Sequence, residues 1–478
     1  MNEQVDRIYV LESMPVYKAI WNLALPTMMA MLVQVIYNMT DTFFIGKLNQ
    51  PNMVAAISIS MPVFMMIQAF GNIYAVGGAS LISRLLGQGD RGGASRTGAI
   101  SFWSALVVCS AVSLAGLIFI KPVLMSCGAS ADTYGFGKSY LSIMLLGSPV
   151  IGLKMALAGL LRSEGATREA MIGMVSGSIL NIILDPVFIF LFKMDVAGAA
   201  VATVIGNVVG FLYCLSFYLG KKGVVSISWE HYRFDREIYA EIFKIGIPAS
   251  IGMILTSTGF AIANVFAAGF GDVVVAANGV TMRITNITVM LSMGLAFGCQ
   301  PLMGFSYGAR DYDRLAETIK KAIFIGTIIC TSLAILFYSF SDFWIRVFIN
   351  DPTVIALGAK IIRSFSLGMP VLGMQMLLMS TFQSLGKMYQ SLAISLGRQG
   401  LFFIPALSIF SSLWGFNGFI RAMPVADVAT ALLSLILYLA FKQRFQLIPK
   451  GCPERLISQS EPGRPQKQED ICYSGGRN

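Results

Sequence analysis

The sequence is poor in charge. Only 13% of its 478 residues are Asp, Glu, Lys or Arg, about half the share usual in a soluble protein, and 55% are hydrophobic. No soluble fold could bury that much apolar surface, so we expect most of the chain to lie in lipid. The apolar runs lack the alternation of polar and apolar residues typical of a membrane β-barrel. The composition therefore predicts an all-α integral membrane protein.

Histidine and cysteine are also scarce. His231 is the sole histidine, and the seven cysteines are scattered without a Cys-x-x-Cys pair. We therefore expect neither a disulfide framework nor a zinc site. The motifs of membrane enzymes, such as a DDxxD-like or His-rich stretch, are missing as well. We predict that the protein is not an enzyme and binds no cofactor beyond a transported ion. Acidic residues at positions 3, 6 and 12 argue against a removable signal peptide.

Twelve apolar segments are each long enough to cross a bilayer as a helix. The predicted helices cover residues 16–46, 53–83, 96–120, 138–162, 168–192, 196–220, 238–269, 273–306, 315–341, 354–383, 389–412 and 418–442. They divide the chain into an N-terminal segment (1–15), a six-helix bundle (16–220), a linker (221–237), a second six-helix bundle (238–442) and a tail (443–478). The tail is polar and rich in proline, so we expect it to be disordered.

Lysine and arginine are unevenly distributed over the connecting segments. Fifteen follow the even-numbered helices, whereas five follow the odd-numbered ones. The positive-inside rule then places both termini and the 221–237 linker in the cytoplasm. This topology accounts for the net charge of +10 without a nucleic-acid partner. We expect a monomer surrounded by membrane lipid.

The two predicted bundles repeat the same pattern. Pro26 and Pro248 stand 222 residues apart, and Gly165 and Gly386 stand 221 apart. A constant spacing between distant anchor residues indicates two homologous halves. Both halves start on the cytoplasmic side, so they form a parallel repeat of the kind found in transporters.

Three acidic residues fall deep inside predicted helices. Asp41, Asp185 and Asp427 each cost roughly 2.5–3.5 kcal/mol to insert, so each is expected to face the protein interior and to have a function. Counting along the helices places Asp41, Asp185 and Thr203 in the outer half of the membrane. Asn181 precedes Asp185 by one helical turn. Polar side chains also precede Asp41 on its own helix, namely Gln34, Tyr37 and Asn38.

The polar residues of the first half therefore predict a cation site whose ligands are oxygen atoms. Pro186 lacks an N–H group and frees the carbonyl of Ile182 as a further ligand. Two carboxylates with amide, hydroxyl and carbonyl oxygens suit a small cation or a proton. The second half has Asn264 and Ala406 at the positions of the two acids, which favours a single site. The alternative is that both acids only form hydrogen bonds between helices.

Several segments are distinctive, namely PTMMAMLVQVIYNMTDTFFIG, VAAISIS, LLRSEGATR, NIILDPVFIF and RQGLFFIP. In this order they resemble the multidrug and toxin extrusion (MATE) family, bacterial branch, and the resemblance covers residues 15–445. It implies two six-helix bundles around a central cavity and cation-driven export of drug-like molecules. The family's cation-binding positions fall on Asp41, Asn181, Asp185 and Thr203. Its helix-kink proline falls on Pro26, and its substrate-cavity positions fall on Gln34, Tyr37 and Asn38. The acids that some members carry in the second half are missing in 245–271 and 364–386.

We thus expect a secondary active multidrug efflux transporter in the plasma membrane. It would export cationic, amphipathic molecules in exchange for Na⁺ or H⁺ by alternating access of its two bundles. A flippase for lipid-linked saccharides is the alternative, because Lys154, Arg283 and Arg398 could hold a pyrophosphate. Asp427 is expected to pair with either Arg398 or Arg283.

Overall fold

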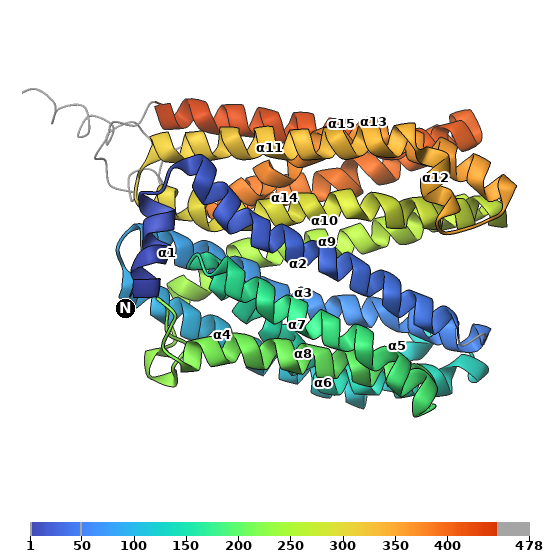
Figure 1. Ribbon diagram of the computed structural model, residues 1–478, viewed down its shortest axis with the longest axis horizontal. Helices are drawn as coiled ribbons and strands as arrows, with labels where there is room; N and C mark the ends of the chain where they lie inside the picture. Colours follow the sequence, from blue (N-terminus) through green and yellow to red (C-terminus); the bar gives the residue numbers. More distant parts are fainter. Residues whose placement is uncertain (1, 48–49, 447–478) are drawn as a thin grey trace, which may run out of the picture.

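The computed structural model describes residues 2–47 and 50–446, and helices make up most of this range (Figure 1). The first half contains α1 (Asn2–Glu12), α2 (Val16–Gly46), α3 (Pro51–Gly87), α4 (Arg91–Ile118), α5 (Ile120–Ser126), α6 (Ala131–Ser163), α7 (Thr167–Pro186), the π-helix η1 (Val187–Leu191) and α8 (Asp195–Leu219). The second half contains the 3₁₀ turn η2 (Trp229–His231), α9 (Arg236–Ala268), α10 (Asp272–Gly308), α11 (Tyr312–Ser339), α12 (Ser341–Arg346), α13 (Pro352–Ser384), α14 (Met388–Leu396), the π-helix η3 (Gly397–Phe403) and α15 (Ile404–Gln446).

Eleven helices in the described ranges are long and apolar enough to cross a membrane. The last of them combines the eleventh and twelfth predicted helices, but its backbone is not helical at Gly415, where φ is 56°. That left-handed conformation favours glycine. Gly418 lies against the carbonyl of Phe410, although eight residues of straight helix would span about 12 Å. The chain therefore reverses at Gly415, and the prediction of twelve crossing segments is confirmed.

The spanning helices form two six-helix bundles, which we call the first bundle (α2 to α8) and the second bundle (α9 to α15). In Figure 1 the helices α6, α7 and α8 lie on one side and α11, α13 and α15 on the other. The leading helix of each bundle crosses to the other one, because α2 packs on α10 and α9 packs on α3. Thr27 donates a hydrogen bond to the carbonyl of Gly294 (2.6 Å), and Ser250 donates one to the carbonyl of Ala69 (2.8 Å). The predicted repeat thus appears in the fold as paired crossing helices.

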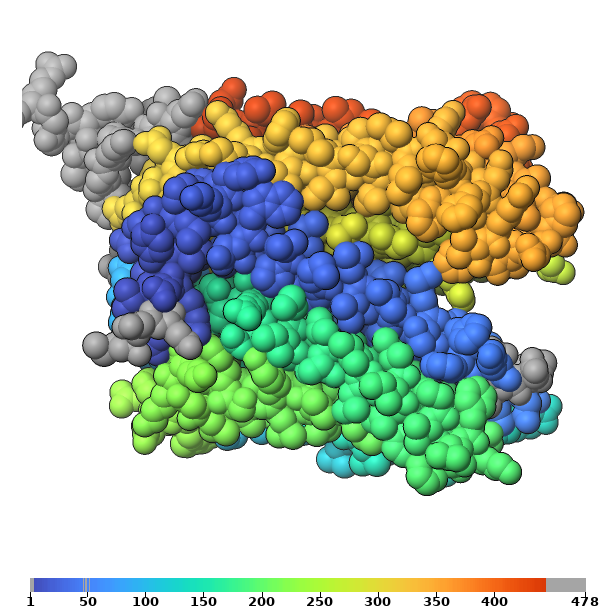
Figure 2. Space-filling view, viewed as in Figure 1, coloured from blue at the N-terminus to red at the C-terminus, as the bar shows by residue number. Residues whose placement is uncertain are grey.

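The two bundles meet closely at one end of the molecule. A methyl group on Gly87 would overlap the carbonyl oxygen of Phe305, so only glycine allows α3 and α10 to approach this closely. The Arg84 guanidinium forms an ion pair with Glu241 at 2.9 Å, which joins α3 to α9. Ser80 donates a hydrogen bond to the carbonyl of Gln383 in α13. Figure 2 shows the bundles parting toward the opposite end. We call the tightly packed end the closed end.

Helix α1 lies across the closed end and was not among the predicted helices. Leu11 is 1% exposed, and the Arg314 guanidinium donates to the carbonyls of Leu11 (3.1 Å) and Val10 (3.3 Å). Eleven residues are too few for a spanning signal, so the search for long apolar segments passed over this helix. The short helices α5 and α12 were missed for the same reason. Helix α15 runs to Gln446, past the predicted boundary at 442, and the predicted disorder from 447 onward lies outside the described residues.

Candidate functional site: a buried carboxylate in the first bundle

Asp185 occupies the last turn of α7, one turn after Asn181. The Asp185 side chain is 0% exposed and that of Asn181 is 2% exposed. Among the residues that the structure describes, neither oxygen of the Asp185 carboxylate has a hydrogen-bond partner, and the Asn181 carbonyl oxygen has none either. Buried polar groups are almost always hydrogen-bonded. These three oxygen atoms therefore form a group that can accept an external donor or cation.

Helices α2 and α8 bring further polar groups to Asn181. The Asn181 amide donates to the Thr203 hydroxyl at 3.2 Å, and the Tyr37 hydroxyl lies 3.5 Å from the same atom. The Asn207 amide donates to the backbone carbonyl of Thr203 at 2.7 Å. Three helices therefore converge beside Asp185, and the structure brings together Asn181 and Thr203, two of the predicted cation-site residues, with Tyr37, a predicted cavity residue.

Asp41 lies one turn after Tyr37 on α2. Its side chain is partly buried, and its charge acts on both Asp185 and Tyr37. Within the described part of the chain, the Asp41 carboxylate takes part in no ion pair. Two carboxylates that share a buried region repel each other unless a cation or a proton compensates their charge. The arrangement can therefore hold one small cation or a proton.

The remaining predicted cavity residues lie elsewhere on α2. The Gln34 amide donates to the Asn38 side-chain oxygen at 3.2 Å, and Asn38 is exposed. Tyr37 is thus the predicted cavity residue that contacts the buried group, whereas Gln34 and Asn38 bond to each other. Their contribution to a substrate cavity stays a prediction.

The end of α7 has an unusual backbone. Pro186 closes the helix, and the π-helix η1 follows directly. The fifth spanning helix of the second bundle also contains a π-helix, η3. Such segments are rare and frequently occur at functional sites. The role of the Ile182 carbonyl as a cation ligand stays a prediction.

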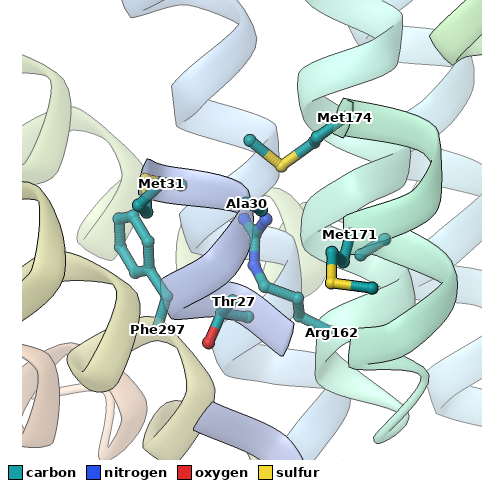
Figure 3. A pocket seen from close by; sticks show the side chains of 8 residues that line it. Thr27, Ala30, Met31, Arg162, Met171, Met174 and Phe297 are labelled. Atoms are coloured by element: carbon teal, nitrogen blue, oxygen red, sulfur yellow. The ribbon is translucent and has the colours of Figure 1, made fainter. Parts of the chain in front are cut away.

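Pro26 lies inside α2, and the next residue, Thr27, lines a tight crevice between the bundles (Figure 3). Its lining includes Thr27 of α2, Arg162 of α6, Met171 of α7 and Phe297 of α10. The Arg162 guanidinium points toward α2 and lies 5.3 Å from the centroid of the Phe297 ring. The Arg162 guanidinium therefore lies between α6 of the first bundle and α10 of the second bundle. The role of Pro26 as a hinge stays a prediction.

The second bundle contains a paired charge at its centre. Arg398 Nε donates to Asp427 at 3.0 Å, so of the two predicted partners for this acid, Arg398 is the one that the structure brings to it. The Asn278 amide donates to the side-chain oxygen of Asn264 at 3.1 Å. Asn264 stands where the first half has Asp41, and it therefore forms a neutral amide pair in place of a charged group.

One buried acid escaped the sequence analysis. Glu164 follows α6 and is 1% exposed, and its Oε2 accepts hydrogen bonds from the backbone N–H groups of Val224 and Val225 (3.1 Å for Val225). Burial raises the pKa of Glu164 to about 7, against the opposing effect of these hydrogen bonds. The segment RSEG looks like an ordinary charged loop in sequence, so its position between two spanning helices gave no signal of burial.

Taken together, the fold and the site define a multi-pass membrane protein of two homologous six-helix bundles. In the first bundle the buried carboxylate of Asp185 has no hydrogen-bond partner among the described residues. The MatE family model matches residues 26–187 and again 248–409. The chain therefore belongs to the MatE family, and the two matches are 222 residues apart, like the predicted repeat. The family resemblance found in the sequence is confirmed.

Characterised relatives extend this result over most of the chain. Multidrug export protein MepA of Staphylococcus aureus is 30% identical over 92% of this chain and 97% of the relative. The protein of the same name from Staphylococcus saprophyticus is 29% identical, with the same coverage. A solved structure described as the outward-facing conformation of a multidrug resistance MATE family transporter superposes with a TM-score of 0.87 at 26% identity, over 91% of this chain and 98% of that one. These relatives are transport proteins and not enzymes.

Proposed function

We propose that this protein is a secondary active exporter of cationic, amphipathic drug-like molecules, driven by the inward movement of a small cation. The observation that carries the proposal is the buried carboxylate of Asp185, which has no hydrogen-bond partner within the described ranges and lies near Asp41 in the first bundle. A site that served structure alone would not need two uncompensated acids. The export proteins named MepA among the relatives support drug-like cargo.

The mechanism that we propose is competition for these two acids. With Asp41 and Asp185 empty, a cationic substrate compensates their charge. A coupling cation that arrives from outside takes the place of the substrate and favours a different arrangement of the bundles. Transport follows because each ligand binds the two arrangements with different affinity. Since the bundles part at the end opposite α1, we assign the described state to an outward-open conformation with both termini in the cytoplasm of the cell.

The donor atoms favour Na⁺ as the coupling ion, with H⁺ as its competitor. Asn181 and Thr203 add oxygen atoms that a dehydrated metal ion can use, whereas a proton needs only a carboxylate. Both ions would bind at the same acids, so each would reduce the effect of the other. Within this proposal, Na⁺ and substrate do not occupy the site together.

The test is efflux from proteoliposomes of uniform orientation, with ethidium as a fluorescent monocationic probe. We expect an inward Na⁺ gradient at equal pH to drive efflux, and a pH gradient without Na⁺ to drive it less strongly. The Asp185→Asn and Asp41→Asn variants should show background efflux under both gradients while inserting normally. Efflux by these variants at the wild-type rate, or efflux that needs neither gradient, would refute the exchange mechanism and favour the flippase alternative.

A further inference from the structure

Helices α7 and α8 pack with backbone against backbone. Gly173 and Gly177 of α7 face Gly210 and Gly206 of α8. A methyl group added at Gly206 would lie 2.5 Å from the carbonyl oxygen of Gly177, and one added at Gly210 would lie 2.5 Å from the carbonyl oxygen of Gly173. Side-chain carbons do not approach other atoms this closely, so the two helices are as near to each other as only glycine allows.

A further glycine contact lies on the other side of Thr203. Gly198, five residues before Thr203, packs against the π-helix η1, and a methyl group there would lie 2.8 Å from the carbonyl carbon of Phe188. Gly206 follows Thr203 by three residues on the same helix. The backbone of α8 is therefore held against α7 and η1 on both sides of the hydroxyl that accepts from Asn181. We call Gly198 and Gly206 the flanking glycines.

The contact at Gly206 reaches the carboxylate site directly. A methyl group at Gly206 would lie 3.2 Å from Cβ of Asn181. The carbonyl of Gly177, which packs on Gly206, stands four residues before Asn181 in α7 and so accepts the helical hydrogen bond of its N–H group. Asn181 is 2% exposed, and its side-chain oxygen has no hydrogen-bond partner among the described residues. The glycine contact thus fixes the position of a buried oxygen atom that a cation can use.

The separation of the two helices sets the length of a hydrogen bond at this site. The amide of Asn181 and the hydroxyl of Thr203 are 3.2 Å apart, at the long end of the normal range for an N–H···O bond. A methyl group at either flanking glycine would push the backbones apart, and this bond would be lost. The oxygen atoms beside Asp185 would then surround a wider space. Sites made of oxygen ligands select between cations through cavity size and ligand number, so the wider space would suit a larger ion.

We propose that Gly198 and Gly206 are positioning residues that keep the cation site small and so make it prefer Na⁺ over K⁺. This inference rests on the proposed function, because it takes the two acids of the first bundle as the Na⁺ site. The flanking glycines do not touch the ion. They act through the backbone, by holding Thr203 against Asn181.

The experiment measures binding of radioactive Na⁺ to the full-length protein in nanodiscs at constant pH, with K⁺ as the competitor. We expect the wild type to bind Na⁺ saturably and to bind K⁺ at least tenfold more weakly. Gly206→Ala should raise the Kd for Na⁺ about fivefold, because it breaks one hydrogen bond worth about 1 kcal/mol. The Kd for K⁺ should stay the same, so the preference for Na⁺ falls about fivefold. Gly198→Ala should change both values in the same direction.

Gly210→Ala is the matched control for this experiment. It adds the same methyl group against a backbone carbonyl of the same interface, but Gly210 lies seven residues from Thr203, about 10 Å along α8. We expect it to lower thermal stability as much as Gly206→Ala does and to keep the wild-type preference for Na⁺. An equal loss of preference in this control would show that any loosening of α7 from α8 has this effect, and it would overturn the inference.

The double variant with Gly206→Ala and Thr203→Val tests how the glycine acts. If Gly206 acts by holding Thr203 against Asn181, the added methyl group should have little further effect on Na⁺ affinity once the hydroxyl is gone. Two losses of affinity that add in the double variant would contradict this route.

The outcomes separate this inference from the proposed function. If the wild type binds no Na⁺, the Na⁺ site itself is refuted and the inference falls with it. If the wild type binds Na⁺, and both Gly198→Ala and Gly206→Ala keep its affinity and its preference, only the role of the flanking glycines is refuted. Failure of both variants to fold, while Gly210→Ala folds, would show that the flanking glycines serve stability alone and would refute their role as well.

Discussion

The two bundles share one fold but differ in how they hold buried charge. In the second bundle, Arg398 meets Asp427 at 3.0 Å, so the acid and its counter-charge belong to the same bundle. In the first bundle, neither oxygen of Asp185 has a partner within the described ranges, and the nearby Asp41 adds a second negative charge. Duplication therefore produced one bundle with a compensated interior and one bundle with an uncompensated interior.

The basic residues of the first bundle do not remove this imbalance. Lys154 lies beside Gly210, and Arg162 stacks on Phe297. Gly210 follows Thr203 on α8 by seven residues, about 10 Å along the helix, so Lys154 lies nearer the closed end than the acids. The first bundle thus has separated charges of opposite sign. In the proposed mechanism, a mobile cation that binds at Asp41 and Asp185 balances the charge of these two acids.

The largest predicted effect is on transport, and it should separate two variants that each neutralise one buried aspartate, Asp185 in the first bundle and Asp427 in the second. We expect Asp185→Asn to reduce gradient-driven efflux at least 100-fold with little change in thermal stability, because the amide cannot compensate a cation. Asp427→Asn should lower thermal stability, since it leaves the Arg398 charge buried without its partner, and should retain efflux per folded molecule. The measurements are efflux from proteoliposomes and thermal unfolding in detergent. The comparison fails if Asp427→Asn abolishes transport in a fully folded protein.

A smaller effect is expected from replacing the ion pair of the second bundle. Arg398→Met alone should destabilise the protein by about 3 kcal/mol, because removing one partner leaves an uncompensated buried acid. Arg398→Met combined with Asp427→Leu should recover most of this loss, since apolar residues of similar volume often replace a buried pair without cost. Denaturation of the two variants and of wild type measures both steps. A double variant that is stable but inactive would show that the pair takes part in transport.

The sequence predicted the spanning helices, the repeat and the deep acids because each depends on a strong local signal. A long apolar run, a recurring proline and a carboxylate within such a run are all readable without tertiary contacts. Two features were beyond this reasoning. Helix α1 depends on packing against both bundles, and Glu164 is buried only because the linker folds over it. The choice of Arg398 over Arg283 as partner of Asp427 also needed the packing of η3 against α15.

The smallest predicted effect concerns Thr203, whose hydroxyl accepts a hydrogen bond from Asn181 and lies near Tyr37. Thr203→Val keeps the shape and removes one hydrogen bond, worth about 1 kcal/mol. We expect the Na⁺ concentration for half-maximal efflux to rise about fivefold, with the maximal rate preserved.

Thr430→Val is the matched control for this experiment. Thr430 is also buried, and its hydroxyl donates to the carbonyl of Ala426 at 2.7 Å within the second bundle. If a buried hydroxyl matters only for packing, both substitutions should shift thermal stability alike and leave the Na⁺ dependence unchanged. A shift in Na⁺ dependence confined to Thr203→Val assigns the hydroxyl to the cation site. If the shift appears in the pH dependence and is missing from the Na⁺ dependence, the proton is the coupling ion at the same acids.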